Sequence, residues 1–199
     1  MSAMADEPKR EVRAALRAAR RGIAAARDVA DDDEAVARAI LALLAAEELG
    51  SGATVTLYES LPGEPPTTAT IAVLHAAGVR VLVPITRPDF DLDWTDAADE
   101  QRRPLGVEAI GAADLVLAPG LSVDASGTRL GQGGGCYDRA LPRRAAEVKT
   151  VVVLHPEEDP GPLRAEEVPV LALPRDPHDI PVDGVVTAAG HHWLRAGRP

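Results

Sequence analysis

The sequence predicts an α/β fold: a single three-layer domain with a mostly parallel sheet flanked by helices. From about residue 50 onward, short apolar runs alternate with stretches of helical periodicity. The runs are rich in Val and Leu without a polar alternation, which is typical of strands buried on both faces. The chain has 199 residues, 46% of them hydrophobic, which is enough for one domain with a sizeable core.

Two helices are expected before the first strand. Over residues 9–27, apolar side chains recur at spacings of four, three and four, which places them on one helical face. These residues are Val12, Leu16, Ala19 and Ile23. A second helix is expected over 34–49, because the aspartates at 31–33 favour a helix N-terminus and Gly50 a C-terminus.

The remaining elements alternate along the chain. Strands are expected at 53–58, 79–83 (stopped by Pro84), 114–118, 150–154 and 185–187, and helices at 67–77 and 137–148. Loops are expected at 59–66, 86–104, 119–136 and 155–169, and loose tails at 1–8 and 190–199. Each loop follows a strand, and ligands of such folds gather at the carboxyl ends of the strands.

Charge and cysteine content exclude several classes of protein. The net charge is −10, made up of +4 through Arg27 and −14 over the remainder, which disfavours nucleic-acid partners. The longest apolar run, Ala39–Ala46, is far shorter than the roughly 20 residues of a membrane span. The single cysteine, Cys136, excludes an intrachain disulfide, and the polar N-terminal stretch lacks the apolar core of a secretion signal. A cytoplasmic protein without a membrane partner is expected.

The most unusual segment is the glycine run at 131–135, where four of five residues are glycine. Glycines let backbone N–H groups approach an anion, so the run is either a phosphate cradle or a flexible strand-to-helix turn, and glycine content favours the two equally. The P-loop motif is absent, because the only lysines are Lys9 and Lys149. The dinucleotide fingerprint fails at Cys136 and lies well beyond the strand that ends at Ala118, which makes an NAD-binding oxidoreductase a poor alternative.

Together with its neighbours, this run resembles the signature of the 5-formyltetrahydrofolate cyclo-ligase (5,10-methenyltetrahydrofolate synthetase) family. The matching segments are PGLSVD at 119–124, GTRLG at 127–131, the glycines, and YDR at 137–139. The resemblance extends to both ends of the chain. Lys9 with Arg13, Tyr58 with Glu64, and PRDPHDIPVD at 174–183 are similar to further family segments.

The resemblance implies an enzyme that uses MgATP to convert 5-formyltetrahydrofolate into 5,10-methenyltetrahydrofolate, with release of ADP and phosphate. It implies Mg²⁺ as cofactor, ATP as co-substrate and small-molecule partners only, and we expect a monomer. A non-catalytic nucleotide or folate sensor that keeps the same cradle is the alternative, and an NAD-binding oxidoreductase is a weaker one.

The resemblance also assigns roles to residues. Arg129 and Tyr137 are the predicted catalytic residues, Tyr58 and Glu64 the folate-binding residues, and Asp138 and Asp179 the magnesium ligands. The predicted ATP-binding residues are Lys9, Arg13, Arg129, Leu130, Gly131, Gln132, Gly133, Gly134, Gly135, Cys136 and Tyr137. Locally, ordinary alternatives exist: a solvated basic face for Lys9 and Arg13, a helix cap for Asp138, a turn aspartate for Asp179, an exposed loop glutamate for Glu64 and a core anchor for Tyr137.

Four further positions bear on the site. Trp94 is expected either to form a wall for the pterin or to cover the core. Three residues depart from the family pattern: Cys136 replaces a tyrosine, Val123 replaces an aromatic residue, and Gly134 stands where some members carry lysine. These departures remove aromatic surface beside the ligand and one positive charge from the cradle.

Overall fold

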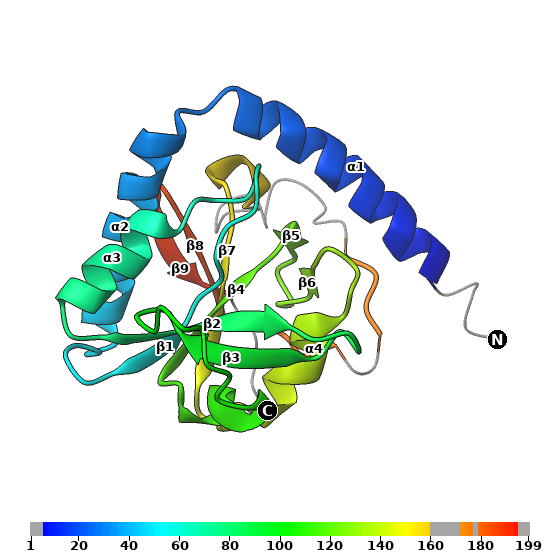
Figure 1. The fold of residues 1–199 in the computed structure, drawn as a ribbon. Helices are drawn as coiled ribbons and strands as arrows, with labels where there is room; N and C mark the ends of the chain where they lie inside the picture. Colours follow the sequence, from blue (N-terminus) through cyan, green and yellow to red (C-terminus); the bar gives the residue numbers. More distant parts are fainter. Residues whose placement is uncertain (1–5, 160–171, 177–178, 195–199) are drawn as a thin grey trace.

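The computed structural model describes residues 6–159, 172–176 and 179–194, and it is built on a seven-stranded sheet (Figure 1). The strands are β1 Thr54–Thr56, β2 Arg80–Thr86, β3 Leu92–Asp96, β4 Leu115–Pro119, β7 Lys149–Val153, β8 Gly184–Thr187 and β9 Gly190–Trp193. Their order is β3-β2-β1-β4-β7-β8-β9. The inner strands pair in parallel and only the edge strands β3 and β9 pair antiparallel, which confirms the predicted α/β fold.

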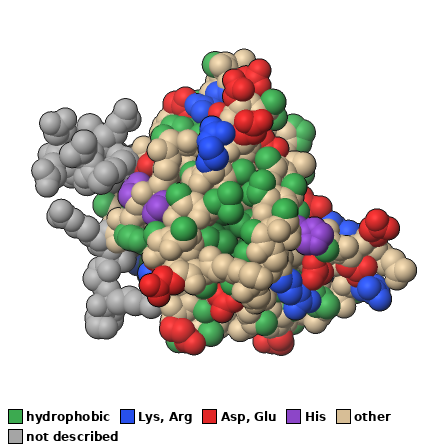
Figure 2. Space-filling model, turned by 90° about the vertical axis from the view of Figure 1, so that its left-hand side faces the viewer, with side chains coloured by type: hydrophobic (Ala, Val, Ile, Leu, Met, Phe, Trp, Pro, Cys, Tyr) green, Lys and Arg blue, Asp and Glu red, His purple; other side chains and the backbone are tan. Residues whose placement is uncertain are grey.

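Helices cover both faces of the sheet. The α-helices are α1 Asp6–Ala25, α2 Val29–Ala46, α3 Thr68–Ala76 and α4 Cys136–Ala140, and the 3₁₀ turns are η1 Val107–Ala112, η2 Leu141–Arg143 and η3 Pro156–Glu158. Helices α2 and α3 pack on one face, and η1, α4 and η2 pack on the other. Figure 2 views the side that carries α2 and α3, where hydrophobic side chains gather at the centre. Within the described parts of the chain, no helix is long and apolar enough to cross a bilayer.

Side chains of the central strands alternate between the two covered faces. In β4, Leu115 and Leu117 point to α2 and α3, whereas Val116 and Ala118 point to the opposite layer. All four are almost fully buried. A strand covered on both sides needs apolar residues at every position, which explains why these strands read as continuous apolar runs.

The start of helix α2 differs from the prediction because a different aspartate caps it. Helix α2 begins at Val29, since the Asp28 carboxylate accepts hydrogen bonds from the backbone N–H groups of Ala30 and Asp31. Asp33 serves another helix: its carboxylate accepts the Ala69 N–H at 3.0 Å, at the start of α3. Two aspartates five residues apart thus cap two different helices, and the local sequence does not show which helix each one caps.

The strand β2 does not stop at Pro84, as predicted, but continues to Thr86. Leu82 is the last residue of β2 with a partner in β1, and Pro84, two residues later, faces the same side beyond the end of β1. The missing N–H of Pro84 therefore removes no hydrogen bond to β1. On the opposite edge of β2, Pro84 pairs with Trp94 of β3. Proline is tolerated because β2 is locally an edge at this point.

Three further predictions are wrong. The expected loop 86–104 contains β3, whose Trp94 is fully buried in the core and is not a pocket wall. The expected helix 137–148 is only α4 followed by η2, since Pro142 cannot continue the helical hydrogen bonds. Residues 190–193 form strand β9 and not a loose tail, and helix α1 already begins at Asp6.

The expected loop 119–136 contains a small hairpin of β5 Ser122–Val123 and β6 Arg129–Leu130. Asp124, which is 4% exposed, holds the hairpin turn. Its carboxylate accepts the N–H groups of Ser126 at 2.9 Å and Thr128 at 3.0 Å, and also that of Leu173 at 2.9 Å. The aspartate of the PGLSVD segment is therefore a structural residue that shapes the approach to the glycine run.

We predict that Asp124→Ala lowers the free energy of unfolding by about 3 kcal/mol, because buried N–H donors lose a charged acceptor. Glu34→Ala is the control: Glu34 is an exposed α2 residue in a long ion pair with Arg38, and its removal should cost less than about 0.5 kcal/mol. Urea denaturation of both variants measures the difference. Equal unfolding midpoints for the two variants would contradict the role given to Asp124.

Candidate functional site

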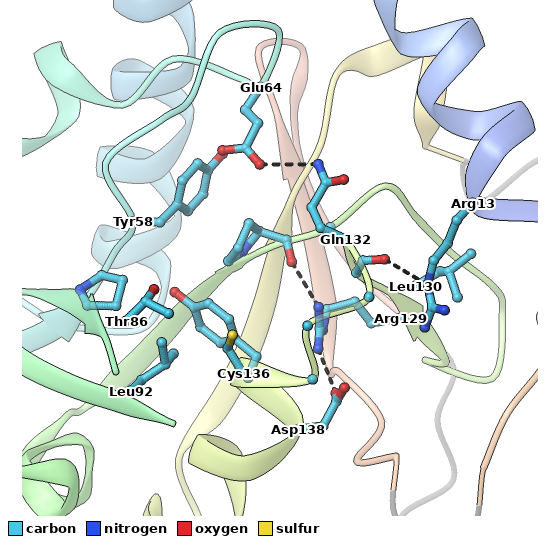
Figure 3. Close-up of a pocket in the computed structure, with 18 of the residues that line it drawn as sticks. Arg13, Tyr58, Glu64, Thr86, Leu92, Arg129, Leu130, Gln132, Cys136 and Asp138 are labelled. Carbon is cyan, nitrogen blue, oxygen red and sulfur yellow. Dashed lines mark hydrogen bonds and ion pairs between the residues drawn. The ribbon is translucent and has the colours of Figure 1, made fainter. Parts of the chain in front are cut away.

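A pocket of about 400 Å³ opens at the carboxyl ends of β1, β2 and β4 (Figure 3). Its walls come from the segment after β1, the β2–β3 hairpin, the glycine run and helix α1. Every predicted site residue lines it: Lys9, Arg13, Tyr58, Glu64, each residue from Arg129 to Asp138, and Asp179. Its size and its place at the strand ends suit a small-molecule ligand.

The glycine run bends in ways that other residues rarely adopt. Gly133 and Gly135 have φ angles of +107° and +69°. A Cβ at Gly131 would lie 2.6 Å from Nη1 of Arg129, so the run wraps closely over that guanidinium. The β5–β6 hairpin separates the run from β4, and this differs from the dinucleotide fingerprint, in which the glycines follow their strand directly.

Arg129 lies at the base of the pocket and is 9% exposed. Its guanidinium donates to the carbonyl of Pro119 at 3.2 Å and to Oδ1 of Asp138 at 2.7 Å. The guanidinium carbon lies 5.7 Å from the ring centroid of Tyr137, a cation–π distance. The buried Nε–H has no acceptor among the described residues. One donor of this buried cation is therefore unsatisfied within the part of the chain that the structure describes.

Helix α1 brings two cations to the other side of the glycine run. The Lys9 ammonium lies 2.6 Å from a carboxylate oxygen of Asp176 and 2.7 Å from one of Asp179. Burial lowers the pKa of Lys9, but hydrogen bonds to the two aspartates outweigh it, so the pKa is raised and the charge is retained. Arg13 donates from Nε to the carbonyl of Gly131 at 3.2 Å. Neither residue is merely part of a solvated basic face.

Sequence reasoning missed Asp176, although it lies in the PRDPHDIPVD segment that the family resemblance covers. Its N–H donates to the Asp179 carboxylate at 2.8 Å, so the two aspartates form one local turn around Lys9. Asp179 is therefore both a turn aspartate and a pocket residue, as the two interpretations predicted. Residues 177–178 of this segment lie outside the described residues.

The predicted magnesium ligands are already paired with cations. Asp138 is paired with Arg129, and Asp179 with Lys9. Gly135 is the N-cap of α4, so the alternative of a helix cap for Asp138 is wrong. Among the described residues, no three metal-binding side chains come together. A magnesium ion would fit here only if phosphate oxygens completed its coordination, which is the arrangement that magnesium commonly takes.

Tyr58 and Glu64 form the wall opposite these cations. The buried Tyr58 hydroxyl donates to the Pro65 carbonyl at 3.1 Å, and burial raises the pKa of Tyr58 well above its usual value. One Glu64 oxygen accepts the Leu61 N–H at 3.1 Å, and the other lies 3.5 Å from the Gln132 amide nitrogen. Glu64 is half-buried at the pocket edge, and not the fully solvated loop residue of the alternative reading.

Tyr137 packs its ring edge-on against Trp94, with centroids 6.3 Å apart. Its hydroxyl is buried and has no hydrogen-bond partner among the described residues. Burial raises the pKa of Tyr137, so the phenol stays protonated at neutral pH and can donate a hydrogen bond. Tyr137 is both a core anchor and a pocket residue.

The three departures from the family pattern differ in their surroundings. Val123 is 2% exposed and packs in a small core cluster with Val152 and Leu154, away from the pocket. Cys136 and Gly134 both line the pocket, and a Cβ at Gly134 would lie 3.2 Å from the Cys136 sulfur. The departures at 134 and 136 therefore alter the pocket surface itself. The departure at 123 alters only the packing of the small core cluster.

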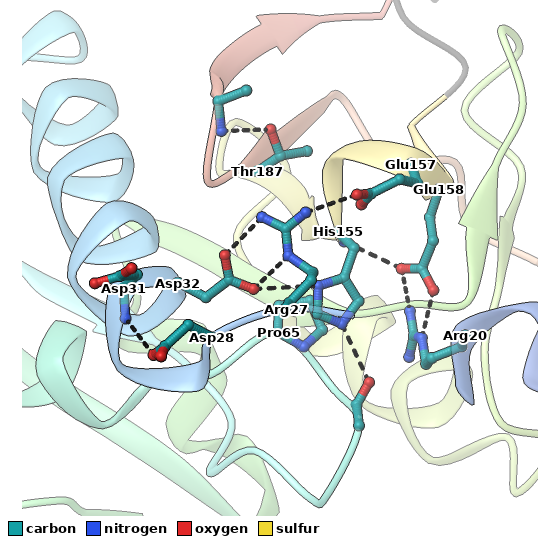
Figure 4. Close-up of polar contacts among 12 residues, drawn as sticks. Arg20, Arg27, Asp28, Asp31, Asp32, Pro65, His155, Glu157, Glu158 and Thr187 are labelled. Carbon is teal, nitrogen blue, oxygen red and sulfur yellow. Dashed lines mark hydrogen bonds and ion pairs between the residues drawn. The ribbon is translucent and has the colours of Figure 1, made fainter. Parts of the chain in front are cut away.

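A buried polar network, which we call the clamp, fixes α1 over the pocket (Figure 4). Arg20 of α1 is 5% exposed, donates to both carboxylate oxygens of Glu158 in η3, and donates to the carbonyl of Gly120 at the end of β4. Glu158 in turn accepts the N–H of His155 at 3.1 Å. One buried ion pair thus connects the helix that carries Lys9 and Arg13 to the sheet.

The clamp continues to the wall that carries Glu64. Nε2 of His155 lies 3.2 Å from the Gly63 carbonyl, and its other ring nitrogen lies 4.0 Å from Asp32. Asp32 accepts two hydrogen bonds from Arg27, which also pairs with Glu157 at 2.7 Å. The pairs of Arg20 with Glu158 and of Arg27 with Glu157 join residues more than 100 positions apart, so no local sequence pattern predicts them.

Comparison with known proteins gives a consistent result. Residues 5–188 match the 5-formyltetrahydrofolate cyclo-ligase family. A 5-formyltetrahydrofolate cyclo-ligase of Mycolicibacterium smegmatis is 36% identical over 154 residues, which are 69% of this chain and 74% of the relative. A mitochondrial 5-formyltetrahydrofolate cyclo-ligase of Arabidopsis thaliana is 30% identical over 123 residues, 59% of this chain and 42% of that protein.

Two solved structures share the fold. A 5,10-methenyltetrahydrofolate synthetase from Mycoplasma pneumoniae superposes with a TM-score of 0.67 at 19% identity, covering 88% of this chain and 98% of that one. The 5,10-methenyltetrahydrofolate synthetase of Aquifex aeolicus superposes with a TM-score of 0.67 at 23% identity, covering 96% of this chain and 95% of that one. At these identities the likeness concerns the fold.

The clamp leads to a stability prediction. We expect Arg20→Ala to lower the free energy of unfolding by about 3 to 5 kcal/mol, because Glu158 is left as a buried, unpaired charge. The double variant Arg20→Met/Glu158→Leu should recover most of that loss, since it removes both charges. Thermal denaturation of the two variants and the parent tests this. A double variant no more stable than Arg20→Ala would contradict a buried ion pair at this position.

Proposed function

The chain belongs to the 5-formyltetrahydrofolate cyclo-ligase family, and from this premise we propose how its pocket closes 5-formyltetrahydrofolate to 5,10-methenyltetrahydrofolate at the expense of ATP. The observation that carries the proposal is the pocket itself. It places Lys9, Arg13 and Arg129 around a bare glycine backbone, and it places Tyr58 and Glu64 on the opposite wall. A triphosphate and a flat polar ring system fit these two sides.

The reaction needs activation because a formamide oxygen is a poor leaving group. In the proposed sequence the formyl oxygen attacks the γ-phosphorus, and the bond from that phosphorus to the bridging oxygen breaks to release ADP. N10 of the folate then attacks the imidate carbon and loses its proton, the bond from carbon to the phosphorylated oxygen breaks, and phosphate departs. The protein contributes position and charge stabilisation to this transfer.

We assign the triphosphate to the cationic side. Arg129 donates to a transferring phosphoryl oxygen with its guanidinium, whose Nε–H has no acceptor among the described residues. Lys9 and Arg13 reach the remaining phosphates from one face of α1, and the N–H groups from Gly131 to Tyr137 surround them. In this assignment the glycines are required because Arg129 lies directly beneath Gly131.

Nucleotide binding requires an exchange of partners. Lys9 and Arg129 leave Asp179 and Asp138 for the phosphates, and the released carboxylates face the same phosphates as magnesium ligands. Magnesium bound there would neutralise charge on the phosphate oxygens. Because each cation and each carboxylate is neutralised both before and after the exchange, no buried charge is left alone.

We assign the pterin to the wall of Tyr58 and Glu64. The Glu64 carboxylate accepts hydrogen bonds from the donor edge of the pterin, after releasing its weak 3.5 Å contact with Gln132. Tyr137 stays protonated and donates its hydroxyl to an oxygen at the reacting centre. A binding-only sensor would use the same contacts, so turnover separates the two: the enzyme forms ADP only when 5-formyltetrahydrofolate is present.

We further propose that the protein acts as a monomer in the cytoplasm on small molecules only. A net charge of −10 supports the lack of nucleic-acid partners, because it opposes binding to a phosphate backbone. All residues assigned to the two substrates belong to one chain, which supports activity without a second copy.

For Arg129→Ala we predict a loss of turnover of about 10²- to 10³-fold, because one charge-stabilising donor at the transferring phosphoryl group is gone. The near-ultraviolet absorbance of the methenyl product and the release of ADP give the rate. Arg129→Lys keeps the charge but loses the planar donor set. Its turnover should therefore lie between that of Arg129→Ala and that of the parent. Unchanged turnover in a folded Arg129→Ala protein would reject the assignment.

Tyr137→Phe and Tyr58→Phe form a matched pair. Removal of the Tyr137 hydroxyl should leave stability unchanged or higher, because that buried group has no partner among the described residues, and it should slow turnover about tenfold or more. Removal of the Tyr58 hydroxyl breaks a bond to Pro65 and should cost about 1 kcal/mol of stability. A Tyr137→Phe protein that is destabilised and fully active would contradict the role of Tyr137.

A further inference from the structure

We propose that Phe90, at the tip of the β2–β3 hairpin, stacks on the p-aminobenzoyl ring of the folate at the pocket mouth. This inference rests on the proposed function and adds a residue that neither the sequence motif nor the pocket lining contains. Three observations support it. The chain has few aromatic rings, the backbone of Phe90 is in the left-handed region, and the Phe90 ring lies beside the glycine run.

The chain has few rings that could contact a flat ligand. It contains 2 Trp, 2 Tyr and 1 Phe, and all of them lie among the described residues. Trp94 is fully buried, and Tyr58 and Tyr137 are 3% and 7% exposed with their rings in the core clusters. Trp193 lies on the far edge strand β9 beside Lys149. Only Phe90 offers an exposed ring near the pocket.

Phe90 has an unusual conformation for its residue type. Its φ angle is +63°, in the left-handed region where glycine and asparagine are favoured and a bulky residue is rare. Its N–H closes a turn on the Arg87 carbonyl at 3.0 Å, so the conformation is that of the hairpin tip. The side chain is 54% exposed and contributes little to the core. A bulky ring held on a strained backbone is a candidate for a functional role, and its exposure leaves the ring accessible to a ligand.

The ring lies next to the glycine run. A Cβ at Gly134, which lines the pocket, would be 3.7 Å from Cδ1 of Phe90. The two strands that lead to the tip contribute Thr86 and Leu92 to the pocket wall. The hairpin therefore lines the pocket with its base and carries Phe90 at the rim. The absence of a side chain at Gly134 leaves space beside the ring.

The position selects the folate rather than the nucleotide. In Figure 3, Thr86 and Leu92 lie on the side of Tyr58, whereas Arg13 approaches from the opposite side. The pterin is assigned to Glu64 and Tyr58 and the phosphates to the Arg13 side, so the next ring outward on the hairpin side is the p-aminobenzoyl ring. A phenyl ring and an aminobenzoyl ring stack in an offset or edge-on arrangement.

The test compares Phe90→Asn with the parent enzyme. Asparagine tolerates the left-handed backbone, so the melting temperature should stay the same or rise. The KM for 5-formyltetrahydrofolate should rise roughly 3- to 10-fold, and the KM for ATP should not change. Phe90→Tyr, which keeps a ring, should retain the parent KM. Leu105→Ala is the control, because Leu105 is 45% exposed but outside the pocket.

An unchanged folate KM in Phe90→Asn, or a rise confined to the ATP KM, would overturn the proposal. Calorimetric binding of 5-formyltetrahydrofolate separates this failure from failure of the proposed function. A parent protein that binds the folate but forms no methenyl product would reject the enzyme and not Phe90, and Phe90→Asn should still bind about 3- to 10-fold more weakly. Equal binding by the two proteins, or no binding to the parent, would reject the role of Phe90.

Discussion

The burial of the Arg129 guanidinium is the constraint on which the site depends. Four neighbours meet at this one group: the Pro119 carbonyl at the end of β4, the Asp138 carboxylate of α4, the ring of Tyr137, and the backbone of Gly131 above it. A buried cation is tolerated only when its surroundings supply acceptors. Because both the end of β4 and helix α4 accept hydrogen bonds from Arg129, the guanidinium fixes them relative to each other. The glycine run follows from the same fact, since a side chain at 131 would occupy the space of the guanidinium.

The clamp performs the corresponding task for α1, which lies across the strand ends and not within the two layers that cover the sheet (Figure 1). Its apolar residues are only partly buried, so hydrophobic packing alone fixes it weakly. The Arg20–Glu158 pair supplies the specificity of position, and His155 carries the connection to Gly63, next to Glu64. The helix with the phosphate-side cations and the loop with the pterin-side carboxylate are therefore held by one polar network.

Local signals predicted the fold and most of the pocket, and non-local ones account for what was missed. Continuous apolar runs located β1, β4, β7 and β8, and a contiguous motif located Arg129 to Asp138, because both properties belong to neighbours in sequence. Strands β3 and β9 were missed because they are edge strands with polar residues, and Pro84 concealed the end of β2. The pairing of Lys9 with Asp176 joins residues 167 positions apart, and no local pattern announces such a contact.

Three energetically unfavourable features lie beside the pocket. The Nε–H of Arg129 and the hydroxyl of Tyr137 are buried without acceptors among the described residues, and Phe90 holds a left-handed backbone at the rim. Each such feature costs on the order of 1 to 3 kcal/mol, and all three lie beside the same space. An apolar or glycine substitution at each of these positions would relieve its cost. In the proposed complex the ligand accepts hydrogen bonds from Arg129 and Tyr137 and covers the Phe90 ring, which accounts for the presence of these costly features beside the pocket.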